Sequence, residues 1–177
     1  MYHFNQIQFY IGKGGVGKST ISALQALQFS KSGVKTLLIS LDPAHNQQDI
    51  FEKELSDTPV YMTENLHVAE PNIDKWIKKY LKESEEKIQA NYSYQRAFSI
   101  KNYFKLFKYS PTVEEFAMLM ALDYYLNNFK VDLLVIDMPP TALSLRFFAL
   151  PAISLKWLEQ LFELRKAINK RKKLFLN

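Results

Sequence analysis

The sequence contains no cysteine among its 177 residues. This absence excludes disulfides, thiolate metal sites and cysteine nucleophiles, and a reducing cytoplasm is the simplest setting for such a chain. The sequence also lacks a run of about 18 apolar residues, and its N-terminus has no basic segment followed by a long apolar stretch. We therefore expect a cytoplasmic protein with no membrane span and no export signal.

Most of the chain also lacks a large excess of positive or negative charge. The formal net charge is +5, and six basic side chains lie close together near the C-terminal end: Arg165, Lys166, Lys170, Arg171, Lys172 and Lys173. Such a cluster can attract phosphates or anionic lipid, or it can be a solvated helix end favoured by the helix dipole. We do not expect nucleic acid as a partner.

The apolar pattern predicts an α/β fold. Hydrophobic residues make up 47% of the chain, which is enough for one core. Apolar runs without alternation are typical of a parallel sheet covered by helices on both faces. We expect strands at residues 6–11, 35–41, 66–69 and 131–136, and helices at 18–32, at 73–92 and from Ser110 onward, with Pro111 in the first position of the last helix. Residues 93–109 are aromatic and basic, and their pattern predicts no element.

A phosphate-binding motif, G-x-x-x-x-G-K-[ST], lies between the first predicted strand and the first predicted helix. Its glycines let backbone N–H groups and the helix N-terminus face phosphate oxygens. Lys18 would place a positive charge near the β and γ phosphates, and the Ser19 hydroxyl would ligate magnesium. The motif therefore predicts that ATP and Mg²⁺ bind at Gly12, Lys13, Gly14, Gly15, Val16, Gly17, Lys18, Ser19 and Thr20.

Lys13 is a lysine that the general motif does not require. Followed by Gly-Gly-Val-Gly-Lys, it resembles the deviant Walker A motif of the division-site and chromosome-partitioning ATPases, the nitrogenase iron protein and the arsenite-pump ATPases. The resemblance implies a homodimer in which Lys13 acts catalytically on the partner subunit's nucleotide, as an arginine finger would. The alternative is a solvated loop lysine.

Residues 42–49 read Asp-Pro-Ala-His-Asn-Gln-Gln-Asp and follow the second predicted strand. They resemble the switch I signature D-P-A-H-N-x-x-D of the arsenite-pump and tail-anchored-protein-targeting ATPases. A carboxylate at the end of such a strand can orient an attacking water. The resemblance gives Asp42 this catalytic role and a contact to magnesium through water, whereas the alternative for Asp42 and Pro43 is a turn. We expect His45 to be a structural or switching residue and not a catalytic base.

Asp137 ends the predicted strand at 131–136, where a Walker B aspartate would hold magnesium through water. The residues after it resemble the family's switch II, with matches at Asp137, Pro140, Thr141, Leu145, Arg146 and Pro151. The main departures are Met138, Pro139, Ala142 and Leu143, where the family usually has Thr, Ala, Gly and His. Loss of the glycine and the histidine predicts altered phosphate sensing and slow hydrolysis.

Residues 111–115 resemble the family's P-G-x-x-E segment, with Thr112 in place of glycine.

The resemblance covers residues 6–151 and implies a P-loop NTPase, with a mostly parallel sheet flanked by helices and a helical insertion. Family members continue into further strands, so we expect residues 1–177 to form a single domain that is truncated at its C-terminal side and has an incomplete sheet. The helical regions within it are expected at 72–130 and 151–175. The expected function is an ATP-hydrolysing dimeric switch that couples its nucleotide state to a partner, which could be a hydrophobic client protein or a membrane.

Two alternatives to that function remain at the level of sequence. One is a non-catalytic module that senses nucleotide, and the other is an ATPase that positions cargo on membrane or DNA. The D-P-A-H-N segment argues against the second alternative, and the absence of cysteine disfavours arsenite transport.

An apolar stripe at helical spacing follows Pro151. It comprises Ile153, Leu155, Trp157, Leu158, Leu161, Phe162, Leu164 and Ile168. By resemblance to the targeting branch of the family, the stripe would face an apolar client. We favour an ordinary core helix, because apolar helical stripes usually pack internally.

Overall fold

The computed structural model describes residues 6–44, 46–91 and 112–175. The chain divides into two compact units, Met1–Phe147 and Phe148–Asn177. Residues 93–109 and His45 lie outside the described residues, as do Ser110 and Pro111.

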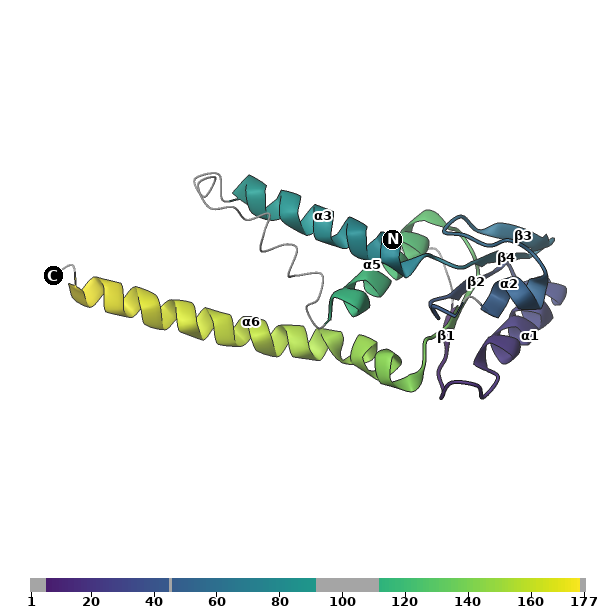
Figure 1. Ribbon diagram of the computed structural model, residues 1–177, viewed down its shortest axis with the longest axis horizontal. Helices are drawn as coiled ribbons and strands as arrows, with labels where there is room; N and C mark the ends of the chain where they lie inside the picture. Colours follow the sequence, from purple (N-terminus) through teal and green to yellow (C-terminus); the bar gives the residue numbers. More distant parts are fainter. Residues whose placement is uncertain (1–5, 45, 92–111, 176–177) are drawn as a thin grey trace. The chain divides into compact units, whose positions relative to one another are not determined.

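Five described strands form one sheet in the order β1-β5-β2-β4-β3 (Figure 1). The strands are β1 (Gln6–Tyr10), β2 (Thr36–Ser40), β3 (Val60–Thr63), β4 (Leu66–Ala69) and β5 (Leu133–Asp137). All neighbours are parallel except β3 and β4, which are antiparallel. Every residue of β2 and β5 is buried, because helices cover both faces of these central strands. The predicted fold class is confirmed, and the sheet is open.

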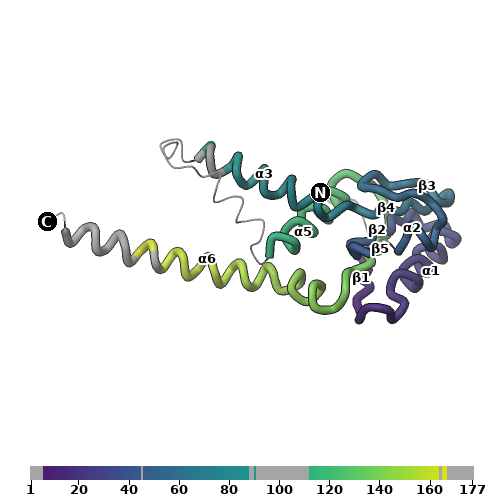
Figure 2. The backbone as a smooth tube through the Cα atoms, viewed as in Figure 1, coloured from purple at the N-terminus to yellow at the C-terminus, as the bar shows by residue number. Residues whose placement is uncertain are grey.

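Helices α1 (Lys18–Lys31) and α5 (Val113–Asn128) pack on opposite faces of the sheet (Figure 2). Along β2, Leu37 and Ile39 join the cluster that includes Met118 of α5, whereas Leu38 joins the cluster that includes Ala23 of α1. This division follows from the alternation of side chains along a strand. The two apolar clusters form the core and fix the strand ends on which the site is built.

Helix α1 ends where the sequence predicts. Gly33 has φ of 83°, and the N–H of Val34 donates to the carbonyl of Phe29. This pattern is the usual glycine-dependent end of a helix, which needs a left-handed residue. The remaining helices are α2 (Asn46–Phe51), α3 (Ile73–Asn91) and α6 (Thr141–Phe175).

Helix α5 is described from Val113 onward. Its N-cap is Thr112, with φ of 82°, so this residue lies outside the helix, where the sequence analysis expects a helical residue. A left-handed residue cannot be part of a right-handed helix. The predicted start at Ser110 and Pro111 lies outside the described residues.

Asp57, in the loop between α2 and β3, joins that loop to α3 and α5. Its Oδ1 accepts hydrogen bonds from Trp76 Nε1 at 2.8 Å and from the backbone N–H of Asn72 at 3.2 Å. Its carbonyl accepts a hydrogen bond from the Tyr125 hydroxyl at 2.7 Å. Burial, with a smaller contribution from the Asp57 charge, raises the pKa of Tyr125, so this hydroxyl remains a donor. We call these contacts the Asp57 hub.

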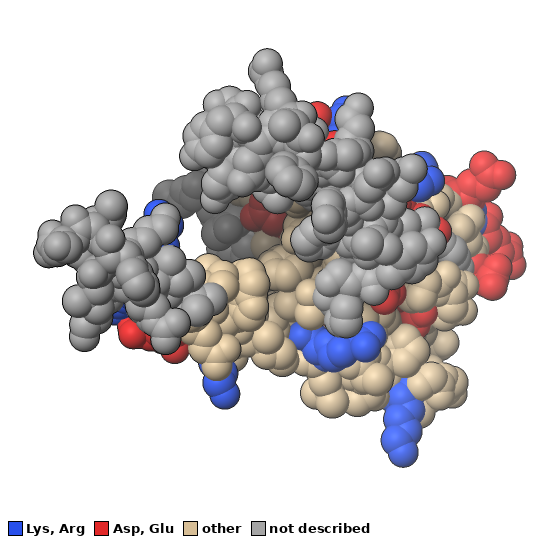
Figure 3. Space-filling view, turned by 60° about the vertical axis from the view of Figure 1, so that its left-hand side comes forward, with Lys and Arg blue, Asp and Glu red and all other residues tan. Residues whose placement is uncertain are grey.

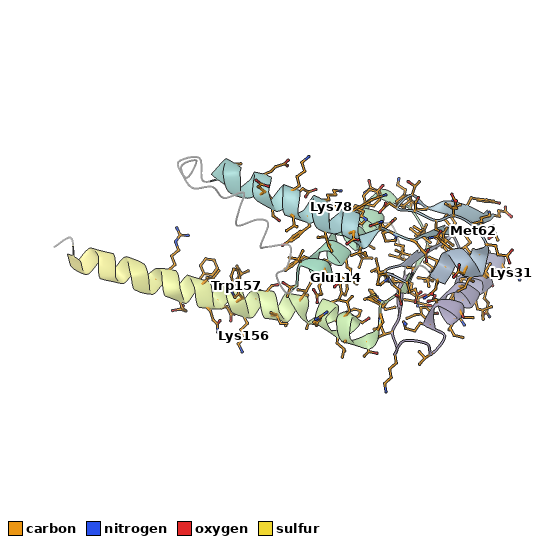
Figure 4. The ribbon with its side chains drawn as sticks, viewed as in Figure 1. Lys31, Met62, Lys78, Glu114, Lys156 and Trp157 are labelled. Atoms are coloured by element: carbon orange, nitrogen blue, oxygen red, sulfur yellow. The ribbon has the colours of Figure 1, made fainter. Side chains whose placement is uncertain are left out.

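The described apolar residues of α6 after Pro151 are exposed. The exposed fractions are 63% for Leu155, 60% for Trp157 and 61% for Phe162, and Figure 4 shows Trp157 and Lys156 extending from the helix. The interpretation of this segment as a core helix is therefore wrong for these residues. The side chains of Leu164 and Ile168 are not described. Within the described residues, no helix is both long enough and apolar enough to cross a membrane.

Candidate functional site

The loop between β1 and α1 has the backbone that the phosphate-binding motif requires. Gly15 and Gly17 have φ of 76° and 85°, which L side chains rarely adopt. A Cβ on Gly12 would lie 3.0 Å from Cγ2 of Val16, so the loop folds tightly over this residue. Gly17 is the N-cap of α1, and because it has no side chain it leaves the N–H groups of the first turn open to an anion.

Strand β5 brings the predicted polar residues together. It lies between β1 and β2, and Asp137 is in register with both Tyr10 and Ser40. The loop that follows β1 and the segment that follows β2 therefore flank Asp137. This arrangement places the site at the carboxyl ends of parallel strands, where ligands bind in open α/β sheets.

Lys18 and Asp42 form a buried ion pair. Lys18 Nζ lies 3.6 Å from Asp42 Oδ2, and the two side chains are 7% and 6% exposed. Asp42 Oδ1 accepts a hydrogen bond from the backbone N–H of Ala44 at 3.1 Å. The turn that the sequence allowed at Asp42 and Pro43 is thus present, and it holds a carboxylate beside the phosphate loop.

Asp137 is fully buried, and one of its oxygens is unsatisfied. Desolvation by burial raises the pKa of this carboxyl, while the Ser19 hydroxyl and the Gln47 amide lower it to a smaller extent. Oδ2 accepts from Gln47 Nε2 at 3.1 Å and from Ser40 Oγ at 3.4 Å. Oδ1 makes no hydrogen bond within the described part of the chain. Buried oxygens of this kind normally have a partner, and a hydrated cation would supply one.

The residues present fit magnesium. The Ser19 hydroxyl and the Asp137 carboxylate are hard oxygen donors, which Mg²⁺ prefers, and Mg²⁺ commonly binds through one or two protein groups together with waters and phosphate oxygens. Among the described residues, no group of three or more His, Cys, Asp or Glu side chains could hold a metal by itself. A site completed by nucleotide phosphates agrees with both observations.

Apart from Gly12, which is half-buried, the predicted site residues form two sets. Lys18, Ser19, Asp42 and Asp137 are buried at the same strand ends. Lys13, Gly14, Gly15, Val16, Gly17 and Thr20 are exposed on the loop and the first turn of α1. The exposure of Lys13 is compatible with either a contact to a partner subunit or a solvated lysine.

Gln47 is a site residue that the sequence analysis missed. It is fully buried in α2, and its side-chain amide reaches Asp137, the carbonyl of Ser19 and the hydroxyl of Ser22. Its backbone N–H donates to Glu70 Oε1 at 2.7 Å. Gln47 occupies an unspecified position of D-P-A-H-N-x-x-D, so the motif gave no signal for it.

Two motif segments far apart in sequence meet at an ion pair. Arg146 Nε lies 2.7 Å from Glu115 Oε1, and Glu115 is 2% exposed. Arg146 is in the switch II segment and Glu115 is in the Pro-Thr-Val-Glu-Glu segment. Met138, a departure from the family pattern, is fully buried in the core, where a methionine side chain replaces a potential polar contact with packing.

The sequence is similar to known proteins over most of its length. The family model described as anion-transporting ATPase matches residues 5–177. A putative arsenical pump-driving ATPase 1 of Aquifex aeolicus is 30% identical over 93% of this chain and 43% of its own length. A putative arsenical pump-driving ATPase of Prosthecochloris vibrioformis is 35% identical over 86% of this chain and 37% of its own length. An ATPase ASNA1 homolog 2 of Paramecium tetraurelia is 34% identical over 89% of this chain and 47% of its own length.

The chain therefore spans less than half the length of these three relatives. Their names describe whole proteins, and each match covers only part of the relative. Because the family model matches almost the whole of this sequence, the chain belongs to the anion-transporting ATPase family.

Proposed function

We propose that this chain binds ATP with Mg²⁺ and hydrolyses the ATP in a homodimeric cytoplasmic switch. The observation that carries the proposal is the meeting of Lys18, Ser19, Asp42 and Asp137 at the ends of β1, β2 and β5, with Asp137 Oδ1 unsatisfied. Loop N–H groups and Lys18 would bind the phosphates. Ser19 and Asp137 would hold Mg²⁺, which neutralises charge on the β and γ phosphates when bound.

Asp42 would orient the attacking water. Its distance to Lys18 means that a bound γ phosphate competes with Asp42 for the lysine ammonium. Once the phosphate is bound, Asp42 becomes available to hold a water in line for attack. Asp42 also lies close in sequence to α2, so we propose that hydrolysis changes the surroundings of this helix.

Phosphate release under steady-state conditions tests this proposal. We expect Asp42→Asn to retain ATP binding and to lower turnover by about 10²- to 10⁴-fold, as loss of a general base does. Asp123→Asn, an exposed site in α5, is the matched control and should behave as the wild type. Equal and negligible turnover by wild type and Asp42→Asn, with ATP still bound, would favour the non-catalytic sensor. Absence of ATP binding would refute the proposal.

The dimer rests on Lys13. Its exposed position on the phosphate loop leaves it accessible to the nucleotide of a second subunit. We expect sedimentation to show ATP-dependent dimers of the wild type, and Lys13→Ala to lower turnover within a preserved dimer. A protein that remains monomeric with ATP and Mg²⁺ would remove the dimer from the proposal.

We propose a hydrophobic client protein as the partner. The exposed stripe of α6 includes Leu155, Trp157 and Phe162, and exposed apolar stripes of this kind bind other apolar surfaces. Photo-crosslinking from positions 157 and 162 in the ATP state should capture an apolar peptide. Failure to crosslink any hydrophobic peptide would exclude this role.

The positioning role has less support. Of the basic cluster, the described side chains are Arg165 and Lys166, and Lys166 pairs with Glu163 at 2.7 Å. Figure 3 shows both acidic and basic side chains on the described surface of the face it presents. Co-sedimentation with lipid or DNA, compared between the intact chain and a variant lacking residues 165–173, tests this role. Binding by the intact chain that is lost in the variant would support it.

A further inference from the structure

Gln47 makes more contacts to the candidate site than its place in a short helix would require. Its side chain is fully buried. Nε2 lies 3.1 Å from the Ser19 carbonyl, 3.2 Å from Ser22 Oγ and 3.1 Å from Asp137 Oδ2. One amide therefore connects α2 with the first turn of α1 and with the end of β5.

The direction of these hydrogen bonds is fixed by chemistry. The Ser19 carbonyl has no proton to donate, and neither does an ionised Asp137 carboxylate. Rotating the amide by half a turn would place Gln47 Oε1 against both acceptors, which would be repulsive. The N–H₂ group must therefore face Asp137. The hydrogen bond to Asp137 is charge-assisted, and such bonds are stronger than those between neutral groups.

Asp137 consequently presents one oxygen to Gln47 and keeps the other free for a ligand. Oδ2 is held by Gln47 and, at 3.4 Å, by Ser40 Oγ. Oδ1 has no hydrogen bond within the described residues. A carboxylate held at one oxygen cannot rotate freely, so the direction of Oδ1 is set by the position of Gln47.

Gln47 itself is anchored from another direction. Its backbone N–H donates to Glu70 Oε1 at 2.7 Å, and the backbone N–H of Glu70 donates to the Ser56 carbonyl at 3.1 Å. Glu70 is 2% exposed. The backbone of Gln47 is thus anchored to the residue that follows β4, which limits the positions that its side-chain amide can take.

We propose that Gln47 is a positioning residue for magnesium, holding Asp137 so that Oδ1 faces the cation bound beside Ser19. The inference rests on the proposed function, because it needs a site for Mg²⁺ and nucleotide. It adds that α2, which follows Asp42, controls the orientation of the Walker B carboxylate. Groups that orient a metal's protein partners typically contribute about 10- to 100-fold in metal affinity.

The test is a magnesium titration of nucleotide binding. A fluorescent ATP analogue is bound to the protein in EDTA and then at increasing MgCl₂, and the half-saturating Mg²⁺ concentration is measured. Gln47→Met has nearly the same length but no donor. We expect it to need about 10- to 100-fold more Mg²⁺, with unchanged affinity for the analogue in EDTA.

Gln48→Met is the matched control, because it makes the same substitution at the next residue of α2, where the side chain is only partly buried. It should titrate as the wild type. A general disturbance of α2 would instead alter analogue binding in EDTA for Gln47→Met, or would affect both variants, and either result would overturn the proposal.

Two further measurements protect the test against a variant that does not fold. Gln47→Asn keeps the carboxamide but is one methylene shorter, so its amide should not reach Asp137 and the Mg²⁺ requirement should rise in the same way. In wild-type protein labelled with ¹⁵N-glutamine, the side-chain amide signal of Gln47 should shift when Mg²⁺ is added to the nucleotide complex. An unchanged signal would overturn the proposal even if neither variant folds.

The outcomes separate this inference from the function beneath it. If the wild type binds no analogue with or without Mg²⁺, the proposed function fails. If the wild type shows Mg²⁺-dependent binding and folded Gln47→Met titrates identically, the role of Gln47 fails and the proposed function stands.

Discussion

The phosphate-loop site buries charged groups, whereas the α6 stripe exposes apolar groups. At the site, Lys18, Asp42 and Asp137 are buried and contact other polar groups. In α6, Leu155, Trp157 and Phe162 are exposed. Burying charge and exposing hydrocarbon both cost free energy. A region that carries either cost is a candidate for function, because stability alone would favour the reverse arrangement.

This difference in burial determines how a function can be argued for each region. The contacts of the site lie within the chain, so its chemistry can be argued from distances. The described apolar side chains of the stripe are exposed, so distances within the described residues do not define a role for it. Stability should therefore respond to substitution in the core beneath the site and should respond little in the stripe.

The largest expected difference in the free energy of unfolding is between Leu→Ala at a buried position and Leu→Ala at an exposed position. Leu38→Ala removes a fully buried side chain and should lower the free energy of unfolding by about 2–5 kcal/mol. Leu155→Ala, at a position 63% exposed, should change it by less than about 0.5 kcal/mol. Urea unfolding measures both. A large loss for Leu155→Ala would mean that the stripe is packed in solution and would remove the contrast.

The next comparison concerns lysines. Lys18→Met removes the ammonium that the site would present to phosphate and should weaken ATP binding by about 10- to 100-fold, the contribution of a hydrogen bond to a charged group. Lys156→Met makes the same change at an exposed position of α6 and should leave ATP affinity unchanged. Isothermal titration of both variants checks the prediction. Equal affinities for wild type and Lys18→Met would contradict the placement of the phosphates.

A pH-dependent stability is expected from the buried Asp137. Its pKa is raised above 3.8, so the folded state binds its proton more tightly than the unfolded state does. The carboxyl therefore costs stability as pH rises from 3.8 through the folded-state pKa, and this cost is constant above it. Asp137→Asn removes the charge and should be more stable than wild type at neutral pH.

The advantage of Asp137→Asn should shrink as pH falls toward the ordinary range of an aspartate. Urea unfolding at neutral pH and at the lowest pH where the protein stays folded would measure it. A variant that is less stable than wild type at neutral pH would show that the hydrogen bonds of Asp137 outweigh its desolvation.

The smallest effect concerns backbone strain. Among the described non-glycine residues, Glu52 and Thr112 have positive φ, and both lie outside the stripe. Thr112→Gly relieves the strain of a left-handed residue but adds chain entropy to the unfolded state, so the net gain should be up to about 1 kcal/mol. Thr112→Ala keeps the Cβ and should bring no such gain. Thermal unfolding of the two variants distinguishes relief of strain from loss of the threonine side chain.

Long apolar runs and motifs predicted much of the molecule. The runs at 35–41 and 131–136 became β2 and β5, because strands buried on both faces need continuous apolar sequence. The phosphate motif and the resemblance located Lys18, Ser19, Asp42 and Asp137, which the fold brings together. Strand β3 was missed because it is partly exposed, and its sequence therefore has neither a long apolar run nor a clear alternation; β4 is equally short but is mostly buried.

The missed features depend on contacts between distant residues. Gln47 and Asp137 are 90 residues apart in sequence, and nothing near Gln47 indicates that its amide reaches the end of β5. The start of α5 depends on the positive φ of Thr112, which is uncommon for threonine. The stripe of α6 has the pattern of a buried helix, and helical spacing alone does not show what covers it.

The Asp57 hub has a consequence for combining mutations. Asp57 holds α3 through the indole N–H of Trp76 and α5 through the hydroxyl of Tyr125, so the energies of these contacts are not independent. Trp76→Phe and Asp57→Asn remove parts of the same interaction and should together cost less than the sum of their separate effects, as contacting residues commonly do. Once one of these two residues has been substituted, substitution of the other should lower the free energy of unfolding by less than it does in the wild type.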